Sequence, residues 1–345
     1  ERFSGFRLLD RPFYQRVSQF FLHFAVKGRE NHPFGDGYWC SSEDPEWPGF
    51  FAQNPFRVYA ERFGPDLAKR WEREQAAPEI FKLHLLDIFL PKQTPPSVSL
   101  TGETSPMGVF DKAGFISCQT NMEDQDNNTA LLIRASRFGS ISHEHADQGS
   151  FALIRNNKTL ISPSGYFGRA CGSNHHRLWT KTTMAHNCIL VDGGGQAVNS
   201  REAVGRFVSW SHEENRRFQM EMDLSAAYPM LLSYHRFFTL TETELVVEDR
   251  IQSKQPCRIS WLLHTLSCPA LGQDGTLLLR HKGEQLEIRP LEGLESEVQI
   301  TDQFGVDLND GVEEAYQVSM PDQYHITYHT EKKNTHTIVV RMKIG

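Results

Sequence analysis

Cysteine is sparse in this 345-residue sequence, and its spacing excludes the sites that cysteine usually builds. The six cysteines fall at irregular intervals and no CxxC pair occurs. We therefore expect neither a disulfide framework nor a cysteine-based zinc site. Long apolar runs are also missing, because no stretch approaches the ~18 residues that a membrane-spanning helix needs. Together these absences argue against an integral membrane protein and against a small disulfide-stabilised one.

Positive charge is in deficit overall, with 36 Lys+Arg against 43 Asp+Glu and a net charge of −7. This balance argues against nucleic-acid binding, which normally needs a basic face. One segment departs from it: residues 134–181 contain seven basic and two acidic residues, a local charge of +5, which leaves −12 for the rest. A positive field in an acidic protein indicates an anionic small molecule or polymer as partner, although chance clustering on a solvated face is the alternative.

The apolar pattern changes once along the chain and predicts an α+β protein. Apolar residues recur at helical spacing over residues 1–92, interrupted by the loop-like HPFGDGYW at 32–39. Residues 91–108 carry four prolines and many hydroxyl side chains, and residues 93–108 read as a linker. Residues 109–345 contain one period-two segment after another without helices between them, which predicts a large antiparallel β-sandwich.

Histidine is dense in the middle of the chain, where it offers the clearest chemistry. Five of the 15 histidines lie between residues 143 and 186. His143 and His145, in SHEHADQGSFALI, are one residue apart and project to the same face if they begin a strand. Such a pair can share a metal, or one can bind metal while the other faces a substrate. His186, in MAHNCILVDGGGQ, is the natural further metal ligand.

Other catalytic motifs are absent. The sequence contains no GxxxxGK[ST], no GxGxxG after a strand, no GxSxG and no HExxH. The Gly-rich DGGGQ at 192–196 reads as a turn. A cupin-like site would need a nearby downstream Glu, and the next Glu after His145 is Glu202.

Three blocks in fixed order make the sequence similar to the heparinase II/III-like polysaccharide lyases. They are RFGSISHEHADQGSFALI, LISPSGYFG and HHRLWTKTTMAHNCILVDGGGQ. The resemblance implies the end of an α/α toroid followed by a β-sandwich, so that the chain is a C-terminal portion of such an enzyme. It implies β-elimination on a uronate-containing polysaccharide, either alginate or a glycosaminoglycan, and a periplasmic or secreted location.

The resemblance also implies roles for individual residues. His143 matches the catalytic histidine, and His145 and His186 match two ligands of a structural zinc site. Tyr166 is the best remaining tyrosine for proton transfer, because the principal catalytic tyrosine of the family is expected upstream of residue 1. Candidates for binding substrate carboxylates or sulfates are Arg137, Gln148, Arg169, His176 and Arg177.

The sequence departs from the family pattern at the third zinc ligand. The family often has an Asp just before the SGY-like turn, where this chain has Ser162, Pro163 and Ser164. Asp147 is a substitute ligand or, alternatively, the cap of a turn. Two other functions stay open at this point: a uronate C5-epimerase, which shares a similar HxHxDQxSF block, and a non-catalytic carbohydrate-binding module.

Overall fold

The computed structural model describes residues 13, 19–20, 23–24, 34–36, 105–164, 171–213, 216–317 and 319–345. The predicted helical segment 1–92 and linker 93–108 therefore fall largely outside the described residues. The chain divides into two compact units, the first formed by 1–32 and 40–108 and the second by 33–39 and 109–345. The second unit thus combines the strand-rich region with the short loop that the sequence placed among the helices.

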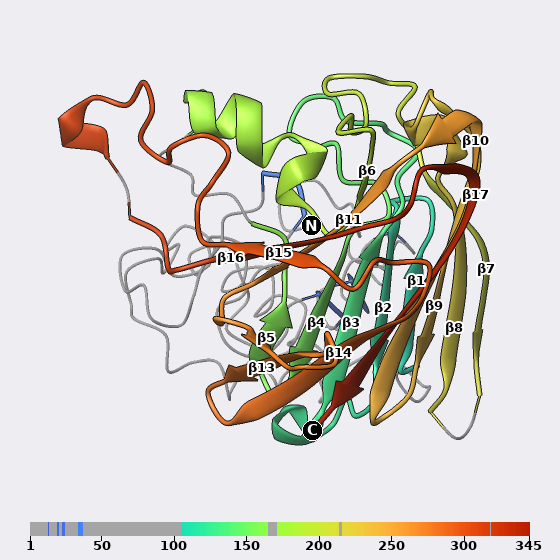
Figure 1. The fold of residues 1–345 in the computed structure, drawn as a ribbon. Helices are drawn as coiled ribbons and strands as arrows, with labels where there is room; N and C mark the ends of the chain where they lie inside the picture. Colours follow the sequence, from blue (N-terminus) through green and yellow to red (C-terminus); the bar gives the residue numbers. More distant parts are fainter. Residues whose placement is uncertain are drawn as a thin grey trace, which may run out of the picture. The chain divides into compact units, whose positions relative to one another are not determined.

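A five-stranded sheet opens the strand-rich unit, with its strands in chain order (Figure 1). The pairs from the second strand to the fifth are antiparallel. The central strand is buried at every position, which explains why its sequence, TALLIR, is nearly continuous in apolar residues. The strands are β1 (Met107–Phe110), β2 (Phe115–Gln119), β3 (Thr129–Arg134), β4 (Phe151–Arg155) and β5 (Lys158–Ile161).

An eight-stranded antiparallel sheet forms the second layer, in the order β12-β13-β14-β17-β10-β9-β8-β7. Residues 235–251 form a hairpin that turns at residues 241–243, between β9 and β10. The strands are β7 (Arg206–His212), β8 (Phe218–Asp223), β9 (Leu231–Leu240), β10 (Glu244–Cys257), β12 (Ala270–Leu271), β13 (Leu277–His281), β14 (Glu284–Glu292) and β17 (Lys333–Ile344).

A four-stranded antiparallel sheet, in the order β15-β16-β11-β6, completes the unit. Its strands are β6 (Ile189–Val191), β11 (Ile259–Thr265), β15 (Val298–Thr301) and β16 (Tyr324–His329). The described residues of the unit also form short helical turns, namely η3 (Gln125–Asn127), η5 (His176–Thr180), η6 (Thr183–Ala185), η7 (Ser225–Ala227) and η8 (Glu314–Tyr316). Among the described residues, no helix has the length and apolar character needed to cross a membrane.

The core lies between the five-stranded and eight-stranded sheets. Strand β8 alternates buried and half-buried side chains, as expected for a strand with one face in a core. Phe151 of β4 meets Phe238 of β9 edge to face, with ring centroids 5.3 Å apart. Cys118 of β2 contacts Met220 of β8, with 3.6 Å between the sulfur atoms. Each such fully buried aromatic side chain contributes roughly 1.5–3 kcal/mol, and the expected antiparallel sandwich is confirmed.

A buried arginine connects the eight-stranded sheet to the loops at its edge. Arg236 on β9 pairs with Asp249 on β10 through Nε and Nη2, at 2.7 and 2.9 Å. Its Nη1 donates to the carbonyls of Gly149 and Asn187, at 2.9 and 2.7 Å. These carbonyls belong to the turn before β4 and the segment before β6, so one guanidinium fixes both segments relative to the sheet. Those two segments carry the histidines described next.

Candidate functional site

Four of the sequence-predicted histidines come together at one edge of the sandwich. His143 and His145 lie in the loop between β3 and β4. His176 begins η5, a single π-helical turn, and His186 lies just before β6. The ring centroids of His145 lie 5.3 Å from those of His186 and 6.4 Å from those of His176. The proximity that the sequence predicted for His145 and His186 is therefore present.

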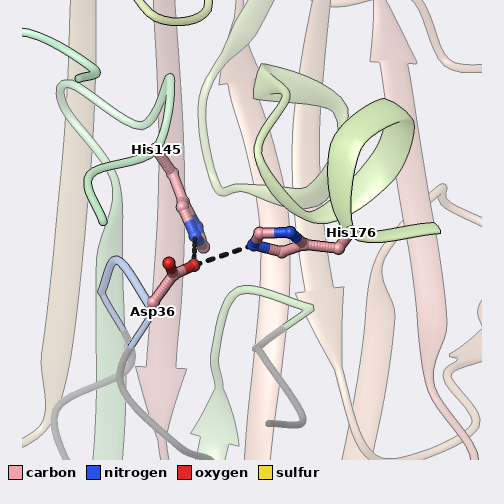
Figure 2. Close-up of side chains that lie close together, drawn as sticks. All are labelled: Asp36, His145 and His176. Carbon is pink, nitrogen blue, oxygen red and sulfur yellow. Dashed lines mark hydrogen bonds and ion pairs between the residues drawn. The ribbon is translucent and has the colours of Figure 1, made fainter. Parts of the chain in front are cut away.

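Asp36 is the centre of this cluster. Its Oδ1 lies 2.9 Å from Nε2 of His145 and 2.9 Å from Nε2 of His176, and Figure 2 shows both rings approaching that oxygen. Its Oδ2 lies 2.8 Å from Nδ1 of His143. Burial raises the pKa of the Asp36 carboxyl, but the hydrogen bonds from the three imidazoles outweigh burial and hold that pKa well below its usual range. The carboxylate is therefore ionised throughout the physiological range.

His143 differs from the other three histidines in being open to solvent. Its side chain is 84% exposed, whereas His145, His176 and His186 are buried. The preceding residue, Ser142, has a positive φ of 58°, and its carbonyl accepts a hydrogen bond from Nζ of Lys181 at 2.5 Å. The backbone next to His143 is thus held in place, while its imidazole ring is accessible to solvent.

The segment 34–36 reaches the site through backbone and apolar contacts. Phe34 is 1% exposed and packs on Phe115 of β2, with ring centroids 5.9 Å apart. The backbone N–H of Asp36 donates to the carbonyl of His143 at 2.8 Å. These contacts place the Asp36 carboxylate next to His143, although the two residues are 107 positions apart in the sequence.

A second group of ligand-type atoms lies on the other side of His145. One ligand atom each of His145, Asp147 and His186 fall within 4.8 Å of one another, and all three residues are buried. Nε2 of His186 donates to the carbonyl of Thr180 at 3.0 Å, which leaves its Nδ1 as the acceptor. Among the described residues, neither Nδ1 of His145 nor Nδ1 of His186 has a hydrogen-bond partner.

This group fits the zinc ion that the sequence resemblance implies. Burial lowers the pKa of both His145 and His186, which keeps the imidazoles in the neutral form that binds metal. Burial raises the pKa of the Asp147 carboxyl to about 7, against the opposing attraction of Arg134. Two imidazole nitrogens and a carboxylate are a usual zinc donor set. A cation bound by these three residues would satisfy the buried Nδ1 atoms of both histidines, which have no hydrogen-bond partner among the described residues.

The positive charge of residues 134–181 lies partly inside the protein. Arg134 is 1% exposed and pairs with Glu144 and with Asp147, whose Oδ1 is 2.8 Å from Nε. Lys181 is largely buried under the loop of His143. The expected cationic surface is therefore weaker than the sequence count indicates, because these charges stabilise internal carboxylates and carbonyls.

Gln148 does not lie where a substrate-binding residue would. It is fully buried, and its side-chain oxygen accepts from the N–H of Ser136 at 2.6 Å. Its side-chain nitrogen donates to the carbonyl of Gly139 at 3.2 Å. Gln148 therefore supports the loop that carries the histidines and offers no surface to a polysaccharide.

The remaining residues predicted to bind substrate differ in how far their side chains are exposed to solvent. His176 is buried and faces Asp36, so its place in the structure is within the histidine cluster. Arg137 is exposed, with a long contact of 3.8 Å to Asp111. Arg177 is exposed and donates to Asn174. Tyr166 and Arg169 lie outside the described residues, so their predicted roles stay predictions.

Asp36 is the residue that sequence reasoning missed. The HPFGDG segment is recognisable as a loop, and its Asp is a possible ligand type, but nothing local connects it to residues more than 100 positions away. The signal available was the compact Phe-Gly-Asp combination: an apolar anchor, a residue free to adopt positive φ and a carboxylate.

Comparisons with known proteins identify relatives of the strand-rich region and of its fold. The family model described as "Heparinase II/III-like, C-terminal" matches residues 102–343. Among curated proteins, no sequence matches this chain. Similar solved structures include a heparinase III, with a TM-score of 0.63 and 16% identity over 96% of this chain and 47% of that chain. Another is the heparan sulfate lyase HepC from Pedobacter heparinus, with a TM-score of 0.63 and 17% identity over 91% and 44%.

A further heparinase III gene product has a TM-score of 0.62 and 14% identity, over 94% of this chain and 45% of that chain. The chain thus spans less than half of the length of each of these three structures. At these identities the likeness shows a shared fold.

Proposed function

Because this chain belongs to the heparinase II/III-like family through its C-terminal domain, we propose that it is part of a polysaccharide lyase that cleaves a uronate-containing polymer by β-elimination. A glycosaminoglycan is the first substrate class to test, since two of the similar structures are titled heparinase III and heparan sulfate lyase. The observation that carries the proposal is an exposed histidine, His143, whose inner nitrogen is held by a carboxylate.

The chemistry requires a proton to leave C5 of the uronate and the bond at C4 to break. The C5 proton is weakly acidic because the resulting anion delocalises onto the carboxylate, and neighbouring positive charge must stabilise it. A neutral imidazole is suited to accept the proton near neutral pH. His143 is the candidate for this role, and exposed Arg177 is a candidate for pairing with substrate anions.

The zinc site is part of the same proposal. His145, His186 and Asp147 would hold the ion, which when bound would cross-link the two histidine-bearing segments and keep the site in shape. Tyr166 remains the proposed proton donor at the leaving oxygen. The proposed location is the periplasm or the cell exterior, where anionic polysaccharides are encountered.

Product formation tests the proposal. The intact protein that contains this chain is incubated separately with heparan sulfate, heparin, chondroitin sulfate, hyaluronan and alginate, and ultraviolet absorbance of unsaturated uronate ends is followed. We expect one polymer to yield absorbing products, and His143→Gln to lower kcat on the order of 10²–10⁴-fold. The matched control is His235→Gln, because His235 also has its Nδ1 2.9 Å from a carboxylate, that of Glu221, but on β9.

Two outcomes would contradict a lyase. If none of the polymers yields unsaturated ends, the β-elimination proposal fails. If the protein exchanges C5 hydrogen for solvent deuterium without shortening the chains, the activity is that of a uronate epimerase, which performs the same proton abstraction and returns the proton to C5.

A further inference from the structure

The hydrogen bonds around Asp36 determine which nitrogen of each imidazole carries its proton. An ionised carboxylate only accepts hydrogen bonds. The nitrogens that face it are therefore the protonated ones: Nδ1 of His143 and Nε2 of both His145 and His176. This assignment follows from the partners alone.

The other nitrogen of His176 supports the assignment independently. The backbone N–H of Gly172 donates to Nδ1 of His176 at 3.1 Å. A nitrogen that accepts a hydrogen bond has a free lone pair, so the proton of a neutral His176 must be on Nε2. Since Nε2 faces Asp36 as a donor, it does not present a lone pair to a metal between Asp36, His145 and His176, although these three residues are close enough for one.

The two ring nitrogens of His145 likewise have different roles. Nε2–H donates to Asp36, which leaves the lone pair on Nδ1, a buried atom without a hydrogen-bond partner among the described residues, as the one available to a metal shared with His186 and Asp147. A carboxylate that accepts from the far nitrogen of a histidine fixes its ring orientation and makes the near nitrogen a better ligand. Asp36 is therefore in contact with both the proposed zinc site and the proposed catalytic histidine.

We propose that Asp36 is the positioning residue of this site: it holds His143 as the Nδ1–H tautomer, so that Nε2 is the solvent-facing proton acceptor, and it orients His145 toward the metal ligands. This inference deepens the proposed lyase function and rests on it for its catalytic consequence. The tautomer assignment itself is independent of any activity.

Asp36→Asn gives a sharp test because asparagine has one acceptor oxygen and one donor NH₂. If the oxygen stays with His145 and His176, the NH₂ faces Nδ1 of His143. His143 must then carry its proton on Nε2, and the nitrogen exposed to substrate is no longer a base. We expect kcat to fall on the order of 10²–10⁴-fold, with KM changing far less, and Asp36→Glu to restore part of kcat.

Nitrogen-15 NMR of the full chain with labelled histidine reads the tautomers directly, at about pH 8, above the ordinary pKa of histidine. His143 is assigned from the signal lost in His143→Gln. We expect Nδ1–H in the wild type and in Asp36→Glu, and Nε2–H in Asp36→Asn. Asp223→Asn is the matched control, because Asp223 is a similarly buried carboxylate, 15% exposed against 10% for Asp36, paired with Arg206.

The outcomes separate the inference from the proposed function. The inference is overturned if His143 in the wild type is the Nε2–H tautomer, a readout that needs His143→Gln only to assign the signal and does not depend on the folding of an Asp36 variant. It is also overturned if folded Asp36→Asn keeps the wild-type tautomer. If the tautomer switches as expected but no polymer is cleaved by the wild type, Asp36 is still the positioning residue, and the lyase proposal alone is lost.

Discussion

Gly35 allows the backbone of residues 34–36 to approach the loop of His143 closely. Its φ is +63°, a conformation that side chains other than glycine rarely adopt. A Cβ at this position would lie 2.8 Å from the carbonyl oxygen of His143. That carbonyl accepts the N–H of Asp36, so a displacement at Gly35 moves the carboxylate and the His143 loop apart.

We expect Gly35→Ala to disturb the site much more than the fold. The left-handed conformation costs an alanine roughly 1–2 kcal/mol, and the clash is with backbone, which cannot rotate away. Lyase activity should fall at least 10-fold, while the urea midpoint falls only modestly. Gly283→Ala is the control, since Gly283 also has positive φ but open space around it. Equal activity in the two variants would contradict the role given to Gly35.

Sequence reasoning found the histidines of the site but not what holds them. His143, His145 and His186 lie in motifs whose spacing carries information. Asp36 is a single carboxylate in a loop, and its role depends on a contact over 107 residues that no local pattern encodes. Gln148 was a candidate for substrate binding because it lies in the histidine-rich block, but its side chain is buried and hydrogen-bonds to backbone groups of Ser136 and Gly139.

At the scale of elements, the proposed zinc ligands are positioned by segments that Arg236 holds. Gly149 and Asn187, whose carbonyls it binds, lie within four residues of His145 and next to His186, respectively. The side chain of Asn187 also donates to the carbonyl of Phe151 at 2.7 Å, which ties the segment before β6 to β4. The sheets therefore fix both histidine-bearing segments relative to each other.

We therefore expect one zinc ion per chain in the purified protein, and a loss of zinc in His186→Asn. Asparagine would retain a buried polar side chain but not the imidazole ligand. Elemental analysis after dialysis against zinc measures the stoichiometry. His336→Asn provides the control, because His336 is another buried histidine, located on β17 and bonded to the carbonyl of Lys333. Retention of a full equivalent of zinc by His186→Asn would exclude the proposed ligand set.

The strands were predictable to the extent that one face of each is buried. β8 and β9 alternate along their length, and the period-two pattern located both. The boundary between β9 and β10 is harder to predict, because only three residues separate the two strands. The short β12, with both residues exposed, offers no apolar pattern to detect.

For the whole molecule, a buried histidine pair makes stability depend on pH. Nδ1 of His264 on β11 lies 2.8 Å from Nδ1 of His325 on β16. Nε2 of His264 donates to the carbonyl of His186 at 3.2 Å, so Nδ1 of His264 accepts and Nδ1 of His325 donates. Burial lowers the pKa of His325 to about 4 and that of His264 well below its usual value. Both rings are thus neutral when folded.

Their effect on stability has a definite sign. The unfolded chain binds protons at these histidines near pH 6.5, whereas the folded chain does not until about pH 4 for His325. Stability from this pair is therefore fully present above about pH 6.5 and is lost as the pH falls toward 4. The slope for each histidine approaches about 1.4 kcal/mol per pH unit within that window.

We expect His325→Asn to flatten this dependence, because the asparagine NH₂ can replace the Nδ1–H donor toward His264 without titrating. Urea unfolding at several pH values between 4.5 and 7.5 measures the slope. Thr327→Asn is the control, since it places the same side chain at a half-buried position of β16 and leaves both histidines in place. If wild type, His325→Asn and Thr327→Asn lose stability equally on acidification, the acid sensitivity arises elsewhere than in the contact between β11 and β16.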